Sequence, residues 1–237
     1  MPQAQPVVIL GGFLSFRALY RGMRDALRRT TGGPVAVVPA STFHWLPVIA
    51  VPGWSFVLDA LDATVRRLAG RSSTGKVTVV GHSAGGVLAR LYLSPRPFRG
   101  RVYGGLDYVD RLITLGSPHT SHRMWLHGGL MARWMEERYP GAFFAPDVHY
   151  TAVAGGSICG DARGSVRERQ AYRFYKHAVG RGDVRGDGVV PVASALLPGA
   201  TAIVLDDVSH YRGFGPIWYG TPEVTPRWWE AADRGDA

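Results

Sequence analysis

Six short, almost purely apolar runs are the feature of this sequence that most constrains its fold. They recur along most of the chain and are rich in valine, isoleucine and leucine. Continuous apolar runs of this length are typical of strands that are buried on both faces of a parallel sheet. The pattern therefore predicts a mostly parallel sheet of about six strands, at Val7–Leu10, Val35–Val38, Val77–Val80, Leu112–Leu115, Thr151–Ala154 and Thr201–Leu205.

Helical patterns lie between the apolar runs. Residues 18–29 place Leu19, Met23 and Leu27 on one stripe with arginines opposite, and residues 57–68 form a second amphipathic pattern. Strands that alternate with helices in this order indicate an α/β fold with right-handed crossovers and helices on both faces of the sheet. In such folds the functional residues gather at the carboxyl ends of the strands.

The domain organisation predicted from the sequence is one α/β domain over residues 1–237. The chain is 46% hydrophobic, which is enough apolar material for a single core. A segment of about 120–147 is not needed to complete the sheet, and we expect it to be a cap or lid insertion. Its tryptophans, phenylalanines and methionines could line an acyl pocket or could belong to an ordinary buried helix. The segment 155–198 is also expected to be irregular.

Composition and charge exclude several other classes of protein. The net charge is +9, but the basic residues, all arginine except Lys76 and Lys176, are scattered, and no nucleic-acid-binding motif is present. We expect no nucleic-acid partner and at most weak contact with an anionic membrane surface. The single cysteine, Cys159, can form neither an internal disulfide nor a zinc site, so no metal or other cofactor is expected. No signal peptide or membrane-spanning run is evident, which favours a cytoplasmic location.

The sharpest chemical motif joins the third apolar run to the start of a helix. It reads Gly-His-Ser-Ala-Gly-Gly over residues 81–86. A serine at this position sits on a strained turn that lifts its hydroxyl clear of the sheet, and glycines two residues before and after it prevent backbone clashes. The motif predicts Ser83 as a nucleophile, and His82 is expected to pack beneath the turn.

A serine nucleophile needs a histidine base, and the order of residues in the chain favours His210. The base follows the nucleophile and the acid in α/β folds of this kind. His44 precedes Ser83, the histidines at 119, 122, 127 and 149 belong to the loop and cap region, and His177 lies before the best candidate for the acid. His210 lies just after the last predicted strand, where its ring could reach Ser83 at the edge of the sheet.

The motifs together resemble those of the lipase-like α/β hydrolases. They are Gly11-Gly12-Phe13, the serine motif, Leu115-Gly-Ser-Pro-His119, Gly186-Asp-Gly-Val-Val-Pro191 and the late His210. The resemblance covers most of the chain and is strongest to small bacterial and plant lipase-like proteins, more distantly to bacterial triacylglycerol lipases and GPI-inositol deacylases. It implies an acyl-enzyme mechanism, a mobile cap after the Gly-Ser-Pro-His strand, and an acid at Asp187.

Other carboxylates also lie between the nucleophile and the base, at Asp161, Asp183, Asp206 and Asp207. Asp187 is favoured because its flanking glycines permit a tight turn and an apolar Val-Val-Pro anchor follows. We expect an Asp187 oxygen within about 3 Å of His210 Nδ1, and His210 Nε2 at a similar or slightly longer distance from Ser83 Oγ. The backbone N–H groups of Phe13 and Ala84 are expected to form the oxyanion hole. Tyr20, Trp45 and His119 could border the cleft, and no role is assigned to them.

The sequence therefore predicts a serine carboxylester hydrolase, an esterase or lipase-type enzyme that acts on a small-molecule apolar acyl ester or lipid. A thioesterase or an acyltransferase would use the same acyl-enzyme, so these alternatives stay open. A non-catalytic protein of the same fold that binds membrane surfaces through its basic residues is a further alternative.

Overall fold

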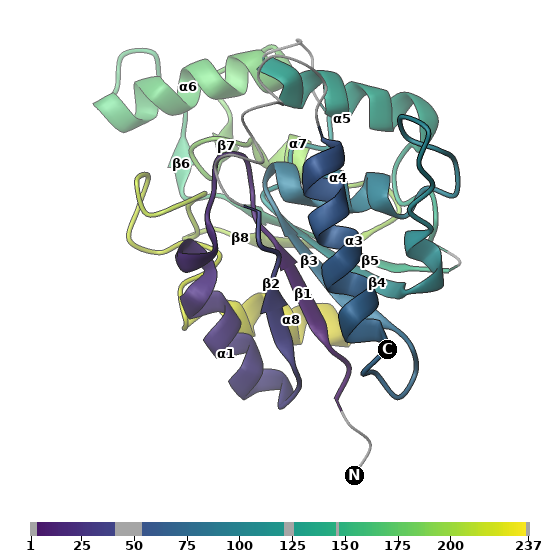
Figure 1. The fold of residues 1–237 in the computed structure, drawn as a ribbon. Helices are drawn as coiled ribbons and strands as arrows, with labels where there is room; N and C mark the ends of the chain where they lie inside the picture. The colour runs from purple at the N-terminus through teal and green to yellow at the C-terminus, as the bar shows by residue number, and fades with distance from the viewer. Residues whose placement is uncertain (1–3, 41–53, 121–125, 146, 236–237) are drawn as a thin grey trace.

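The computed structural model describes residues 4–40, 54–120, 126–145 and 147–235. At the centre of these residues lies a six-stranded parallel sheet with the strand order β2-β1-β3-β4-β5-β8 (Figure 1). All six predicted runs form strands of this sheet, and the predicted fold class is confirmed. The strands are β1 (Val7–Leu10), β2 (Val35–Val37), β3 (Val77–His82), β4 (Val109–Leu115), β5 (His149–Gly155) and β8 (Thr201–Leu205).

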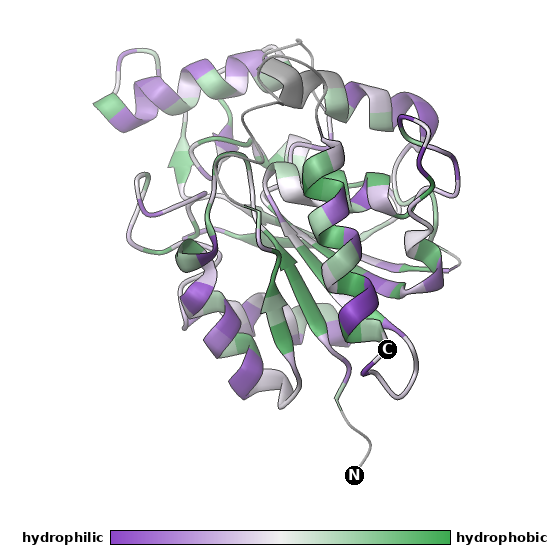
Figure 2. Cartoon of the chain, viewed as in Figure 1, coloured by the Kyte–Doolittle hydropathy of each residue, from purple (hydrophilic) through white to green (hydrophobic). Residues whose placement is uncertain are grey.

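Helices cover both faces of the sheet, as the alternating pattern predicts. On one face, α3 (Ser55–Ala69) and α4 (Ala84–Tyr92) bury their apolar side chains against β1, β3 and β4. On the other face, α1 (Arg21–Thr31) and α8 (Val224–Gly235) pack against each other and against the sheet. The strands between these two layers are the most consistently apolar part of the molecule (Figure 2). Two short 3-10 helices complete this part, η1 (Arg17–Tyr20) and η2 (Gly105–Asp107).

The end of the sheet formed by β8 departs from the prediction that every strand is buried on both faces. Along Thr201–Leu205 the residues are alternately half-buried and exposed. β8 pairs with β5 only, so it is an edge strand and one side of it lies near solvent. An apolar run in the sequence cannot distinguish an edge strand from a central one, because both provide a buried face.

The segment 155–198 was expected to be irregular, and this expectation is wrong for its central part. It contains the helix α6 (Val166–Val179), a two-stranded antiparallel ribbon of β6 (Ile158–Cys159) and β7 (Arg185–Gly186), and the short helix α7 (Val192–Ala195). The helix begins with a capping box in which Ser165 and Glu168 each accept a hydrogen bond from the other's backbone N–H. A serine followed three residues later by a glutamate is typical of the start of a helix, so this part of the sequence indicates α6.

The segment 120–147 contains the helix α5 (Leu126–Arg138), which packs on α4. Met131 and Met135 are buried in the same core cluster as Trp54, and Trp134 packs against that cluster. These three side chains therefore support the interpretation of α5 as a buried helix rather than as the lining of an acyl pocket. Trp125 lies outside the described residues. Whether the segment is a lid that moves over the site stays a prediction.

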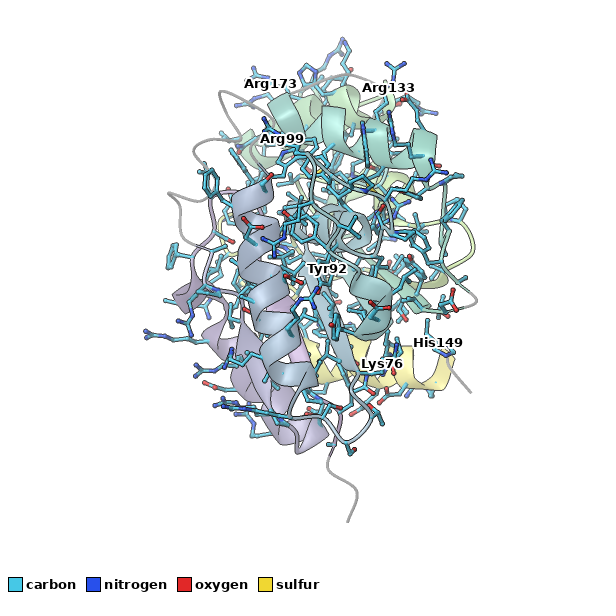
Figure 3. The ribbon with its side chains drawn as sticks, turned by 45° about the vertical axis from the view of Figure 1, so that its right-hand side comes forward. Lys76, Tyr92, Arg99, Arg133, His149 and Arg173 are labelled. Carbon is cyan, nitrogen blue, oxygen red and sulfur yellow. The ribbon has the colours of Figure 1, made fainter. Side chains whose placement is uncertain are left out.

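The two ends of the parallel strands lie at opposite ends of the molecule. Lys76 and His149 lie near the starts of β3 and β5, whereas Arg133 of α5 and Arg173 of α6 lie at the opposite end of the molecule (Figure 3). Since all six strands run in parallel, their carboxyl ends meet below α5 and α6 (Figure 1).

No helix in the described residues is long and apolar enough to cross a membrane. In the same residues, no group of three histidine, cysteine or acidic side chains could hold a metal ion.

Candidate active site

Ser83 stands at the junction between β3 and α4, at the carboxyl end of the central strand. Its backbone has φ 55° and ψ −130°, a left-handed conformation that non-glycine residues rarely adopt. A Cβ atom on Gly85 would lie only 2.5 Å from the carbonyl oxygens of Leu10 and Gly11, and a Cβ on Gly81 would overlap Gly86. The turn is therefore possible because these positions lack side chains, as the motif predicts.

His210 follows β8 and reaches across the sheet to the serine. Its Nε2 lies 3.0 Å from Ser83 Oγ, and its Nδ1 lies 2.7 Å from Asp187 Oδ2. The backbone N–H of His210 donates a second hydrogen bond, of 2.7 Å, to the carbonyl oxygen of Asp187. The ring is almost fully buried. The loop of the histidine is thus fixed to the loop of the aspartate by both backbone and side chain, and both distances agree with those expected from the sequence.

Asp187 comes directly after β7 and is completely buried. Its Oδ1 accepts hydrogen bonds from the backbone N–H groups of Val189 (3.0 Å) and Val190 (2.7 Å). Its Oδ2 accepts one from the hydroxyl of Tyr219 (2.9 Å) in addition to the one from His210. A buried carboxylate needs such partners because an unpaired charge in the interior is costly. The four donors hold Asp187 in one orientation beside the imidazole.

The other acidic candidates face other partners. Asp207 forms a bidentate ion pair with Arg227, with N–O distances of 2.7 and 2.8 Å. Asp206 forms an ion pair with Arg185, with an N–O distance of 3.0 Å. Asp183 pairs with Arg181, and Asp161 accepts a hydrogen bond from the backbone of Arg163. Among the carboxylates considered, Asp187 is the one that contacts His210.

The hydrogen bonds assign a role to each nitrogen of the histidine. A carboxylate can only accept, so Nδ1 carries the proton that is donated to Asp187, and Nε2 is left to accept from the hydroxyl of Ser83. Tyr219 keeps its own proton, because burial and, secondarily, the charge of Asp187 raise its pKa well above 10. This arrangement can remove a proton from a serine hydroxyl and stabilise the imidazolium that results.

The two predicted oxyanion donors belong to different elements, one that follows Ser83 directly and one in the loop after β1. Ala84 is the first residue of α4, so its N–H lies outside the helical hydrogen-bond ladder and at the positive end of the helix dipole. Phe13 belongs to the loop after β1, next to Gly12. The α-carbon of Gly12 packs on the nucleophile so closely that a Cβ there would lie 2.7 Å from Ser83 Cβ. The N–H of Gly12 is already donated to Tyr20, which leaves its neighbour Phe13 as the candidate donor.

A model of the PGAP1-like alpha/beta domain matches residues 55–137, which include β3, the serine turn, α4 and β4. No curated protein matches the sequence.

Several solved structures match nearly the whole chain. A monoglyceride lipase from Saccharomyces cerevisiae, solved with a substrate analog, is 10% identical with a TM-score of 0.55, over 98% of this chain and 87% of the lipase. The pyrethroid hydrolase PytH is 13% identical with a TM-score of 0.54, over 98% and 99% of the two chains. A putative hydrolase of the alpha/beta superfamily from Xanthomonas campestris is 13% identical with a TM-score of 0.51, over 96% and 99%. The chain has the α/β-hydrolase fold.

The resemblance to lipase-like α/β hydrolases noted in the sequence is confirmed at the level of the fold. Within the α/β-hydrolase fold, Ser83 follows the central strand β3, Asp187 follows the β6-β7 ribbon and His210 follows the edge strand β8. The three residues are contributed by loops at the carboxyl ends of the strands or by the ribbon above them. Their catalytic roles are part of the proposal below.

Two residues at the site were not predicted from the sequence. Tyr219 holds Asp187 and also accepts a hydrogen bond of 2.6 Å from the N–H of Gly155. Tyr20 was considered for the border of the cleft but is buried, with its hydroxyl 2.8 Å from His82 Nδ1. His82 lies beneath the serine turn as expected. Neither tyrosine lies in a motif that would have indicated its role.

His119 and Trp45 were the other residues considered for the border of the cleft. His119 is fully buried, and its ring nitrogens lie 3.3 Å from a guanidinium nitrogen of Arg90 and 3.0 Å from the hydroxyl of Thr114. Arg90 in turn donates to the carbonyl oxygens of Tyr139 and Gly141, at 2.6 and 2.9 Å. His119 therefore ties β4 to α4 and to the chain after α5 instead of bordering a cleft. Trp45 lies outside the described residues.

Proposed function

We propose that this protein is a serine carboxylester hydrolase that acts on an apolar acyl ester through an acyl-enzyme. The observation that carries the proposal is the continuous hydrogen-bond path from Ser83 Oγ through His210 to the buried Asp187, at 3.0 and 2.7 Å. The strained backbone of Ser83 adds to it, because strain at a nucleophile is stable only where the surrounding structure enforces it. The α/β-hydrolase fold is compatible with this chemistry but does not by itself establish it.

In the proposed reaction, Ser83 Oγ attacks the carbonyl carbon of the ester while His210 Nε2 takes the hydroxyl proton. The N–H groups of Phe13 and Ala84 stabilise the negative oxygen of the tetrahedral intermediate. When the intermediate collapses, the bond to the alcohol breaks, and His210 returns the proton to the departing alcohol. A water molecule then gives one proton to His210 and attacks the carbonyl carbon of the acyl-serine. The bond from that carbon to Ser83 Oγ breaks, His210 returns the proton to Ser83 Oγ, and the carboxylic acid is released.

Exposed apolar side chains beside the site support an apolar substrate. Phe13, Leu14 and Phe16, on the loop after β1, are 39%, 40% and 54% exposed, and Tyr211 beside His210 is 41% exposed. Large apolar side chains next to a nucleophile favour acyl chains over charged substrates. Exposed arginines on the same loops, Arg17 and Arg212, support weak contact with an anionic membrane surface as part of the proposal. A cytoplasmic location stays a prediction.

The function is tested by ester turnover in matched serine variants. Purified wild type, Ser83→Ala and Ser157→Ala are assayed with p-nitrophenyl acetate, butyrate, octanoate and palmitate. Ser157 is an exposed serine whose hydroxyl bonds to Ser209, so its variant controls for the general loss of a hydroxyl. We expect Ser83→Ala to lower kcat by several orders of magnitude and Ser157→Ala to have little effect. Equal turnover in Ser83→Ala and wild type would refute the proposal.

The same assay separates the esterase from its nearest alternatives. Acyl-CoA thioesters and acceptor alcohols are added in parallel, because a thioesterase or an acyltransferase would form the same acyl-serine. Faster hydrolysis of thioesters than of oxygen esters with matched chains would favour the thioesterase. Transfer of the acyl group to an added alcohol in preference to water would favour the acyltransferase.

A further inference from the structure

His82 occupies a position between two loops of the candidate site that are otherwise far apart in sequence. It directly precedes Ser83, is buried, and lies at the end of β3. Its Nδ1 lies 2.8 Å from the hydroxyl oxygen of Tyr20, and its Nε2 lies 3.1 Å from the backbone carbonyl oxygen of His210. Tyr20 belongs to the segment after β1, and His210 to the loop after β8. One imidazole therefore joins the oxyanion side of the site to the base side.

The donors and acceptors along this path have a single consistent direction. The carbonyl of His210 can only accept, so His82 Nε2 carries the proton and Nδ1 accepts the hydroxyl proton of Tyr20. The hydroxyl oxygen of Tyr20 then accepts the N–H of Gly12, at 3.0 Å. The path thus runs from the Gly12 N–H to Tyr20, from the Tyr20 O–H to His82 Nδ1, and from His82 Nε2–H to the carbonyl of His210. Tyr20 and His82 each donate one hydrogen bond and accept one.

Only the neutral form of His82 fits this path, since a protonated ring has no lone pair for the Tyr20 hydroxyl. Burial and, secondarily, the charge of His210 lower the pKa of His82 well below its usual value. The ring is surrounded by the aromatic rings of Tyr20, Trp218 and Tyr219 and by the imidazole of His210, whose centre is 4.8 Å away. His82 therefore stays neutral when His210 takes a proton.

The path ends on the backbone at both sides of the nucleophile. Gly12 packs directly on Ser83, and its neighbour Phe13 is the candidate oxyanion donor. His210 is held at its N–H by Asp187 and at its carbonyl by His82. Displacement of His82 would therefore remove one hydrogen bond from the Tyr20 side and one from the His210 side of the nucleophile, while Asp187 still holds His210. Loss of the Tyr20 hydroxyl would remove the hydrogen bonds to Gly12 and to His82.

We propose that Tyr20 and His82 are positioning residues that hold the oxyanion loop and His210 in the correct relative positions around Ser83. This inference rests on the proposed function, because these relative positions affect turnover only if Ser83 is the nucleophile. Both side chains are buried, so we expect no direct contact between them and a substrate at Ser83. Both act through hydrogen bonds that orient the groups which contact the substrate, so their effect belongs to kcat rather than to substrate binding.

The test compares Tyr20→Phe with Tyr92→Phe in the turnover of a p-nitrophenyl ester. Both substitutions remove a buried hydroxyl and keep the ring, but Tyr92 lies at the opposite end of α4 from Ser83, and its hydroxyl bonds to Asp62 of α3. We expect Tyr20→Phe to lower kcat about tenfold or more with KM unchanged, whereas Tyr92→Phe changes neither. The double variant Tyr20→Phe/His82→Leu should lose no more activity than the worse of the two single variants, because both break one path.

Imidazole ¹⁵N NMR gives a second readout that does not depend on turnover. We expect His82 to stay neutral with the proton on Nε2 from pH 5.5 to 8, and Tyr20→Phe to shift its Nδ1 resonance. A wild-type kcat in Tyr20→Phe, an equal loss in Tyr92→Phe, or a His82 that titrates in this range would overturn the inference. If Ser83→Ala keeps full ester turnover, the proposed function itself fails, which is a different outcome from an active enzyme that is insensitive to Tyr20→Phe.

Discussion

Acidification should destabilise the fold through His119, which is fully buried between Arg90 and Thr114. Burial is the main cause that lowers the pKa of His119 well below 6.5, and the charge of Arg90 adds to it. Its Nδ1 accepts from the guanidinium, so a proton there would remove the hydrogen bond and set two cations face to face. The folded protein therefore keeps His119 neutral, whereas the unfolded chain binds a proton below pH 6.5. The free energy of unfolding is highest above that pH and falls as the pH decreases.

The size of this effect follows from proton linkage. A histidine that titrates near pH 6.5 when unfolded and stays neutral when folded lowers the free energy of unfolding by about 2 kcal/mol between pH 7 and pH 5. Other groups titrate in the same range, so the contribution of His119 must be isolated by substitution. His119→Gln is suitable because an amide can accept from Arg90 and donate to Thr114 without binding a proton.

The assay is urea denaturation of wild type, His119→Gln and His149→Gln at pH 7, 6 and 5. Between pH 7 and pH 5, wild type should lose about 2 kcal/mol more stability than His119→Gln. The exposed His149 serves as the control, and its variant should follow the wild type. If wild type and His119→Gln lose stability in parallel, His119 is not kept neutral by the fold, and the reasoning from its burial is refuted.

Three further predictions concern the candidate site and the helix above it. Asp187→Asn should lower kcat by about 10⁴-fold in ester assays, because the amide no longer fixes the Nδ1 proton of His210; a loss below tenfold would contradict this role. Tyr219→Phe should lower the free energy of unfolding by about 1.5–3 kcal/mol, since it removes a donor to a buried carboxylate; unchanged urea denaturation would count against it. Met131→Ala should cost about 2–5 kcal/mol in the same measurement, as expected for a core residue. Full stability combined with a selective loss of long-chain ester turnover would instead support an acyl pocket at α5.

The six strands of the main sheet and the helices α1 and α3 could be predicted, because their hydrophobic patterns indicate them. The bounds of β1 and β8 agree with the predicted runs, and β3 extends beyond its run to His82. Gly81 and His82 continue the pairing with β4, but glycine and histidine give no apolar signal. The helix α6 was not predicted, because the glycine and arginine content of its segment is typical of a loop, and the capping box at Ser165 is a short signal within it.

The residues of the candidate site could be proposed from the sequence only where local chemistry restricts them. Ser83 is restricted by its glycines, and Asp187 by the turn on which it lies. Tyr219 could not be found in this way, because its contact with Asp187 spans 32 positions and depends on how two loops meet. The same holds for the bond from His82 to the carbonyl of His210, which spans 128 positions. Side chains that support a site through long-range contacts leave no local pattern in the sequence.

The central claim, that Ser83 is an activated nucleophile, is tested most directly by identifying the residue that a fluorophosphonate probe modifies. Such probes react with serines whose hydroxyl is deprotonated by a neighbouring base. The purified protein is labelled, digested and analysed by tandem mass spectrometry, with His210→Gln and Ser157→Ala as comparison variants. We predict one adduct per chain on Ser83 in wild type and in Ser157→Ala, and strongly slowed labelling in His210→Gln. An adduct on a different serine, or labelling of Ser83 that does not depend on His210, would contradict the account.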